Sequence, residues 1–386
     1  MEEDTSASAP VAPAAPPAHT IPFELRGGHV LLSGTVDGHP ATFILDSGAS
    51  MCALDSGWSA LLATAGSPST ATGGSGAVSM VLARMQSLRL GSLLLRDEAV
   101  ALMPLAAVGE QHGRRIDGTI GYSLFARFVV EIDYAARVLR LHEPAAYQYA
   151  GSGASLPVDL AMRIPIARVT VKLHGSAPID ARLVLDIGAA TLGAAFTAPF
   201  VDAHEDGLAR APQSAATSRG VGNAGTGTVT RLDWIDMAGL RAPEPVVMLM
   251  REHAGFFGVT WADGTIGAAI FERTTAIFDF ARQRVILEPG PMFQAPFAFD
   301  ASGLALSSAP ASADSVIVRS VAPGSVAEHA GLCAGDVITS ICGVRATGES
   351  LEELRALLRT ADVVREVVAR RGDAEMRFPV TLRERI

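Results

Sequence analysis

The chain has 386 residues, enough for two or three domains of ordinary size with their own hydrophobic cores. Its 49% hydrophobic and 18% charged residues exclude a wholly disordered chain. The 31 basic residues stand against 40 acidic ones, which gives a net charge of −9, and Lys172 is the single lysine. No lysine-rich block is therefore available to neutralise phosphates, and we expect neither nucleic acid nor an anionic membrane surface as a partner.

The first residues predict a flexible leader. Residues 1–21 are rich in Ala and Pro and lack the basic and apolar regions of a secretory signal. No apolar run in the chain approaches the ~20 residues of a membrane-spanning helix, so no membrane span is expected. The compartment stays open: removal of an upstream signal would place the chain in the periplasm or outside the cell, and otherwise it would be cytoplasmic. Whether the leader is a propeptide, and what the oligomeric state is, stay open as well.

The cysteines and histidines do not suggest a metal site. Cys52, Cys333 and Cys342 are accompanied by no CxxC or HxxxH motif, so they form neither a disulfide framework nor a zinc site and are expected to be buried or idle thiols. The nine histidines are scattered without metal-ligand spacing. The sequence therefore predicts no metal and no organic cofactor.

Three segments of the first half of the chain recur in the same order in the second half. The pairs are FILDSGA at 43–49 and LVLDIGA at 183–189, DGTIG at 117–121 and 263–267, and IDYAARVLRL at 132–141 and FDFARQRVIL at 278–287. Their displacements, 140, 146 and 146 residues, are nearly equal. This indicates two copies of one domain, which we place at 22–148 and 158–291, with a small, polar linker at 149–157 that suits a hinge.

Both copies are expected to be β-structures. Runs such as Val30–Val36 and Val169–Leu173 are short, rich in β-branched residues and bounded by Gly, Asp and Pro. Residues 296–384 differ: a strand at Val316–Val321 precedes a turn of small residues, and Leu351–Leu358 is an amphipathic helix. The sequence therefore predicts a mainly β protein that ends in a small α+β module.

Each copy ends an apolar run on an aspartate. Asp46 and Asp186 follow runs that should be buried strands, and Gly48 and Gly188 let the chain turn back. A carboxylate there is costly unless it is paired. If the two copies face each other, the two carboxylates meet, and because like charges a hydrogen bond apart cannot both ionise, the pair holds one proton. One member then activates water as a general base while the protonated member polarises a carbonyl.

This pattern resembles the retropepsin-like aspartic proteases, in tandem as in the two-lobed pepsin arrangement, over residues 22–291. The resemblance implies two acid-protease β-barrel lobes that face each other, with Asp46 and Asp186 as the catalytic pair. It implies that the Thr-Ile-Gly segments at 119–121 and 265–267 thread beneath the aspartates and hold them in place. It also implies an aspartic endopeptidase that acts on protein or peptide substrates.

Glycine-rich stretches are candidates for the mobile flap of that family. They lie at 72–80 and 220–227, without the aromatic residue of pepsin-like flaps, and two flexible surface loops are an open alternative. The flap candidates are Gly73, Gly74, Gly220 and Gly222.

The C-terminal residues 296–384 resemble a PDZ domain of the bacterial type. Such a domain binds the carboxylate at a peptide's C-terminus in a loop of backbone N–H groups and adds the peptide as a strand beside a helix. The resemblance implies that peptide C-termini are partners and that this module recruits substrate, with 351–358 as the groove helix. A spacer that binds nothing is the alternative. The candidate carboxylate loop is Gly303, Leu304, Ala305 and Leu306, with Ala305 in place of a glycine.

The second copy departs from the family pattern after its aspartate. The family has Ser or Thr there, as at Ser47, and its two hydroxyls cross-link the opposing loops, but this chain has Ile187. At least one cross-link, worth roughly 1 kcal/mol, should be missing. Residues Ser47, Gly48, Ile187 and Gly188 are expected to support the pair. The alternative is a catalytically impaired peptide-binding protein that uses the cleft and the PDZ groove; a self-associating scaffold is a third possibility.

Overall fold

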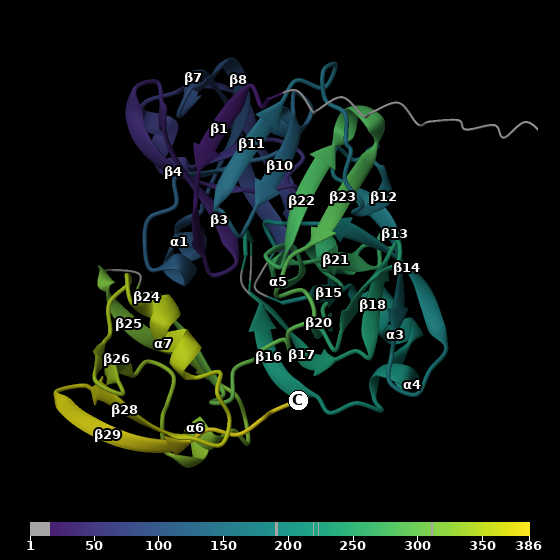
Figure 1. Ribbon diagram of the computed structural model, residues 1–386. Helices are drawn as coiled ribbons and strands as arrows, with labels where there is room; N and C mark the ends of the chain where they lie inside the picture. Colours follow the sequence, from purple (N-terminus) through teal and green to yellow (C-terminus); the bar gives the residue numbers. More distant parts are fainter. Residues whose placement is uncertain (1–15, 190–191, 219, 223, 310–311) are drawn as a thin grey trace, which may run out of the picture.

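The computed structural model describes residues 16–189, 192–218, 220–222, 224–309 and 312–386. Two β lobes lie side by side above a smaller C-terminal domain (Figure 1). The predicted fold class, mainly β with two facing lobes and a small α+β module, is confirmed. In the described part of the chain, no helix is long and apolar enough to span a bilayer.

Lobe 1 is built on an eight-stranded sheet in the order β2-β3-β4-β9-β5-β8-β7-β6. Strand β4 carries buried Phe43, Ile44 and Leu45 immediately before Asp46. The elements are β2 (Glu24–Arg26), β3 (His29–Val36), β4 (His39–Leu45), β5 (Ala53–Asp55), η1 (Ser56–Ala60), β6 (Ala63–Gly73), β7 (Gly76–Leu90), β8 (Leu93–Met103), α1 (Ala106–His112), β9 (Gly118–Ile120) and α2 (Tyr122–Phe125).

Lobe 2 repeats this arrangement. In each lobe the strand before the aspartate pairs in parallel with the Gly-Thr-Ile strand, as β4 with β9 and β14 with β21, and that strand pairs antiparallel with β5 or β15. The elements are β13 (Ile166–Lys172), β14 (Pro178–Leu185), β15 (Ala194–Phe196), α3 (Ala198–Ala203), α4 (Glu205–Leu208), β16 (Ser214–Ser218), β17 (Gly225–Arg231), β18 (Trp234–Met237), β19 (Leu240–Pro243), β20 (Val246–Met250), η2 (Gly255–Gly258), β21 (Gly264–Ile266) and α5 (Ala268–Phe271).

A continuous run of strands joins the lobes in the order β1-β11-β10-β22-β23-β12. At the centre of this run, β10 pairs with β22. The rings of Phe125 and Phe280 stack with their centroids 5.4 Å apart, and the two lobes share one hydrophobic core. The elements are β1 (His19–Pro22), β10 (Val129–Asp133), β11 (Val138–His142), β12 (Ala154–Asp159), β22 (Thr274–Asp279), η3 (Phe280–Arg282) and β23 (Arg284–Pro289).

Two predicted flexible segments are ordered in part, which corrects their boundaries. Residues 1–15 of the predicted leader lie outside the described residues, but His19–Pro22 pairs with β11 and buries Ile21. The predicted linker at 149–157 contributes β12, whose alternating Leu156 and Val158 are buried and which pairs with β23. The two lobes are joined by hydrogen bonds between β10 and β22, and the linker residues of β12 form part of the same run of strands.

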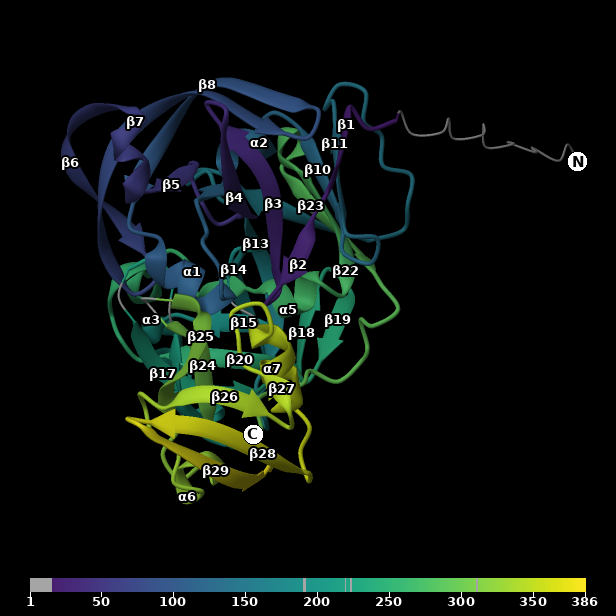
Figure 2. The same ribbon diagram turned by 90° about the vertical axis from the view of Figure 1, so that its left-hand side faces the viewer.

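The C-terminal domain has its own core, formed between Ala301 and Leu382. Its six-stranded sheet has the order β24-β25-β26-β28-β29, with β27 beside β26, so β24 is an edge strand. Figure 2 shows α1 of lobe 1 directly above this domain. The elements are β24 (Leu304–Ala309), β25 (Ser312–Val321), α6 (Val326–His329), β26 (Val337–Ile341), β27 (Val344–Arg345), α7 (Leu351–Leu357), β28 (Val364–Arg371) and β29 (Ala374–Thr381).

Candidate active site

The two aspartates lie on equivalent turns, which we name the aspartate loops (residues 46–48 and 186–188). The backbone N–H of Asp46 donates to the carbonyl of Ile120 at 2.9 Å, and that of Asp186 donates to Ile266 at 3.0 Å. In each loop, Oδ1 of the aspartate then accepts a hydrogen bond from the backbone N–H of the glycine two residues later, at 2.9 Å. The repeated Gly-Thr-Ile strands therefore hold both aspartates in the same local geometry.

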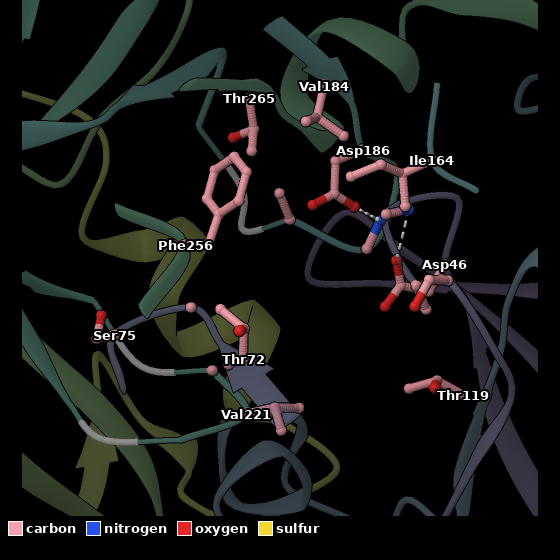
Figure 3. A pocket seen from close by; sticks show the side chains of 18 of the residues that line it. Asp46, Thr72, Ser75, Thr119, Ile164, Val184, Asp186, Val221, Phe256 and Thr265 are labelled. Atoms are coloured by element: carbon pink, nitrogen blue, oxygen red, sulfur yellow. Dashed lines mark hydrogen bonds between the residues drawn. The ribbon is translucent and has the colours of Figure 1, made fainter. Parts of the chain in front are cut away.

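The structure brings the two aspartate loops together, with each carboxyl group against the glycine of the opposite loop. A Cβ atom on Gly48 would lie 2.5 Å from the carboxyl carbon of Asp186, and one on Gly188 would overlap that of Asp46. The two carboxyl groups are close enough to shift each other's pKa, and both face the same cavity (Figure 3). Glycine is thus required in each loop because the opposing carboxyl occupies the space of a side chain.

The surroundings favour one shared proton. Burial raises the pKa of Asp46 above its ordinary value. Burial, and next the negative charge of Asp46, raise the pKa of Asp186 well above its ordinary value. Because two neighbouring buried carboxylates do not both ionise readily, the pair retains a proton over a pH range in which isolated aspartates are ionised.

One side chain links the two aspartate loops. The Ser47 hydroxyl donates to the carbonyl of Leu185 at 2.7 Å and accepts the N–H of Ile187 at 3.1 Å. The Ile187 side chain is fully buried in the apolar core and has no hydroxyl to return the contact. The pair therefore has one hydroxyl cross-link where the family pattern has two.

The predicted flap stretches form the roof of the cavity. The β6–β7 turn meets the loop between β16 and β17: Gly74 N–H donates to the carbonyl of Val221 at 3.1 Å, and Gly74 O accepts from Phe257 of η2 at 3.2 Å. A Cβ on Gly73 would overlap the Val221 oxygen, and Gly222 has a φ of +111°. The two turns thus approach each other too closely for a larger residue at Gly73.

The cavity has a volume of about 630 Å³ and is mostly apolar. The sequence did not single out η2 or His29, because neither lies in a repeated segment; the aromatic run Phe256-Phe257 was the available signal. In Figure 3, Phe256, Thr72 and Val221 lie across the cavity from the two aspartates. Apolar lining residues include Met80, Met103, Met162, Ile164, Met248, Phe256 and Trp261.

Backbone N–H groups of the candidate carboxylate loop already have hydrogen-bond partners within the C-terminal domain. Gly303, with φ of +88°, donates its N–H to Asp300 at 2.7 Å, and the N–H of Leu304 donates to the Ser302 hydroxyl at 3.0 Å. Arg355 of α7 reaches across to the carbonyl of Leu306 at 2.8 Å. A peptide added beside β24 would compete with these contacts.

Family models match two stretches of the chain. An aspartyl protease family model matches residues 32–124, and a PDZ domain model matches residues 317–371. The chain thus contains an aspartyl protease domain and a PDZ domain, as the resemblance predicted. Among solved structures it is similar to the aspartic proteinase from Irpex lacteus, with 14% identity and a TM-score of 0.45 over 72% of this chain and 99% of that one. The search of curated proteins found no match.

Proposed function

We propose that the protein is an aspartic endopeptidase with Asp46 and Asp186 as its catalytic pair. The observation that carries the proposal is the position of the two carboxyl groups, each against the glycine of the opposite loop, in the lining of one mostly apolar cavity. Such a cavity fits a stretch of unfolded polypeptide with apolar side chains.

The chemistry follows from one proton shared by two carboxyl groups. Ionised Asp46 takes a proton from a water molecule as the water oxygen attacks the scissile carbonyl carbon. At the same time, protonated Asp186 gives its proton to the carbonyl oxygen. The tetrahedral intermediate then collapses: the C–N bond breaks, the leaving amine nitrogen takes the proton held by Asp46, and one hydroxyl of the intermediate gives its proton to Asp186 as the carbonyl re-forms. The pair returns to its starting state with one proton.

The PDZ domain is proposed to bind peptide C-termini and so to recruit substrate chains. Its edge strand β24 and helix α7 offer the geometry for adding a peptide strand. Because Arg355 contacts the Leu306 carbonyl, binding requires Arg355 to leave that oxygen first.

The test is cleavage of unfolded casein from about pH 3 to about pH 8, with and without pepstatin. Wild type is expected to cleave, and Asp46→Asn and Asp186→Asn are expected to be inactive. The rival function, a peptide-binding protein with an impaired pair, is favoured by Ile187. It would be supported if all three proteins were inert while peptides still bound.

A further inference from the structure

The PDZ domain contacts lobe 1 next to β24 and α7, the elements between which a peptide is proposed to bind. Helix α1 packs against β24, and the hydroxyl of Ser308, near the end of β24, donates to the carbonyl of Glu110 at 3.1 Å. Arg319 forms an ion pair with Glu110. On the other side of the groove, Gly348 lies against Gly113, where a Cβ atom would overlap the Gly348 backbone. Lobe 1 therefore contacts the PDZ domain both at β24 and at Gly348, just before α7.

Arg26 is the central side chain of this contact. It is 7% exposed. Its Nε donates to the carbonyl of His112 at 2.6 Å, and its Nη atoms bind the Glu349 carboxylate at 3.1 Å and the backbone of Gly348 and Glu349. Arg114 binds the same carboxylate at 3.3 Å. A buried guanidinium with all its donors directed at fixed acceptors is a rigid connection between the two domains.

Two histidines continue this connection to the catalytic pair. The His112 ring packs edge to face on His29, with centroids 4.8 Å apart. His29 Nε2 lies 3.0 Å from the carbonyl oxygen of Gly188, and its Nδ1 lies 3.1 Å from that of Gly27. Burial lowers the pKa of His29, against the raising effect of its contacts with the Gly188 and Gly27 carbonyls, and lowers the pKa of His112 to about 2. His29, on β3 of lobe 1, thus contacts the aspartate loop of lobe 2.

This loop has a particular need for support. Ile187 lacks the hydroxyl that would cross-link it to lobe 1, and Gly188 packs directly on the Asp46 carboxyl. A shift of the loop by a fraction of an ångström would change the distance between the carboxyl groups, on which catalysis depends steeply. A contact from His29 to Gly188 supplies a second link between the lobes at the site of the missing one.

We propose that the docked PDZ domain holds the 186–188 aspartate loop in place through Arg26, His112 and His29. His29 is then a positioning residue that acts on the reaction through the loop. The inference deepens the proposed protease function and rests on it for its kinetic part. It gives the PDZ domain a second role, support of the catalytic loops, besides the recruitment of peptides.

The first experiment disrupts the contact between the PDZ domain and lobe 1 without changing a residue of the 186–188 aspartate loop. Gly113→Ala places a methyl group against the Gly348 carbonyl, at a φ of +67°. Gly91→Ala is the matched control: it has a φ of +55° and its nearest neighbour is Ile21 at 3.8 Å, so it carries the backbone strain without the clash. Glu349→Arg, which sets like charges against Arg26 and Arg114, is a second opening variant, with exposed Glu375→Arg as its control.

Amide hydrogen exchange at residues 185–189 is the primary measurement, because it does not depend on proteolysis. We expect about tenfold faster exchange in Gly113→Ala and Glu349→Arg than in their controls, with a larger radius of gyration by small-angle X-ray scattering. Unchanged exchange in domains that have separated would overturn the proposal. Intact docking in both variants would also overturn it, since Gly113 and Glu349 lie in the domain contact.

Kinetics then separate positioning from general structure. His29→Ala is expected to lower kcat about tenfold with KM nearly unchanged, and His29→Gln, whose amide N–H can donate to Gly188, is expected to restore part of it. His174→Ala, at an exposed histidine of lobe 2, is the control. Equal kcat in His29→Ala and wild type would refute the role of His29. If wild type has no protease activity, the proposed function fails, while the exchange measurement still decides this inference.

Discussion

Removal of the Ser47 hydroxyl is the perturbation with the most directly calculable effect. Ser47 is 1% exposed, and its hydroxyl makes the two hydrogen bonds that tie the aspartate loops together. In Ser47→Ala both bonds are lost, at about 1 kcal/mol each, and the Leu185 carbonyl and Ile187 N–H lose a buried partner. We expect the free energy of unfolding to fall by about 2–4 kcal/mol.

The same substitution should affect catalysis more than stability alone explains. Because Ile187 provides no second hydroxyl, the loops of Ser47→Ala keep no side-chain cross-link of this type, and we expect kcat to fall about 100-fold at a temperature where the variant is still folded. Urea unfolding monitored by tryptophan fluorescence, together with kcat on a fluorogenic peptide substrate, measures both effects.

Two comparisons make this prediction refutable. Ser47→Thr keeps the hydroxyl and should retain most of the stability and activity, and Ser152→Ala, at an exposed serine of the linker, should match wild type. A loss below about 0.5 kcal/mol in Ser47→Ala, within the range of ordinary surface substitutions, with kcat unchanged would show that the loops do not depend on this hydroxyl.

Three further predictions concern the same cavity. In a series of urea titrations, Asp186→Asn should be more stable than wild type near pH 7 and lose that advantage towards pH 3. Because the pKa of Asp186 is raised in the folded state, the folded wild type binds more protons than the unfolded chain between the ordinary and the raised pKa. Its free energy of unfolding therefore falls as the pH rises through that window, whereas Asn does not titrate. Ile187→Thr should change stability by less than about 1 kcal/mol, because a new hydrogen bond offsets the lost apolar contact, and should raise kcat; a lower kcat would contradict the missing cross-link. Gly73→Ala, whose methyl group would meet Val221 and Val78, should raise KM about tenfold by separating the roof, while Gly220→Ala, which has open space, should not.

The sequence predicted the parts of the molecule that are duplicated. Asp46 and Asp186, their glycines and the Gly-Thr-Ile strands lie in segments that recur, and a repeated local motif on a mainly β chain implies a pseudo-twofold arrangement in which equivalent residues meet. The separate core of the C-terminal domain was likewise visible from its change of pattern near residue 296.

The connection from the PDZ domain to the catalytic pair could not be predicted in this way. Its contacts join residues far apart in sequence, such as Arg26 with Gly348 and His29 with Gly188, and neither histidine has a repeated counterpart. The boundaries at β1 and β12 were missed for a related reason. Short edge strands such as His19–Pro22 carry a weak local pattern, and a partner strand elsewhere in the chain determines their structure.

The most direct test of the central claim, that the two carboxyl groups act as one catalytic unit, is a double-mutant cycle on kcat for peptide hydrolysis. If Asp46 and Asp186 share one proton and one water, each single Asn variant should lose nearly all activity, and the double variant should be no slower than either single one. Multiplicative losses, or a single variant that retains most of its kcat, would contradict the account.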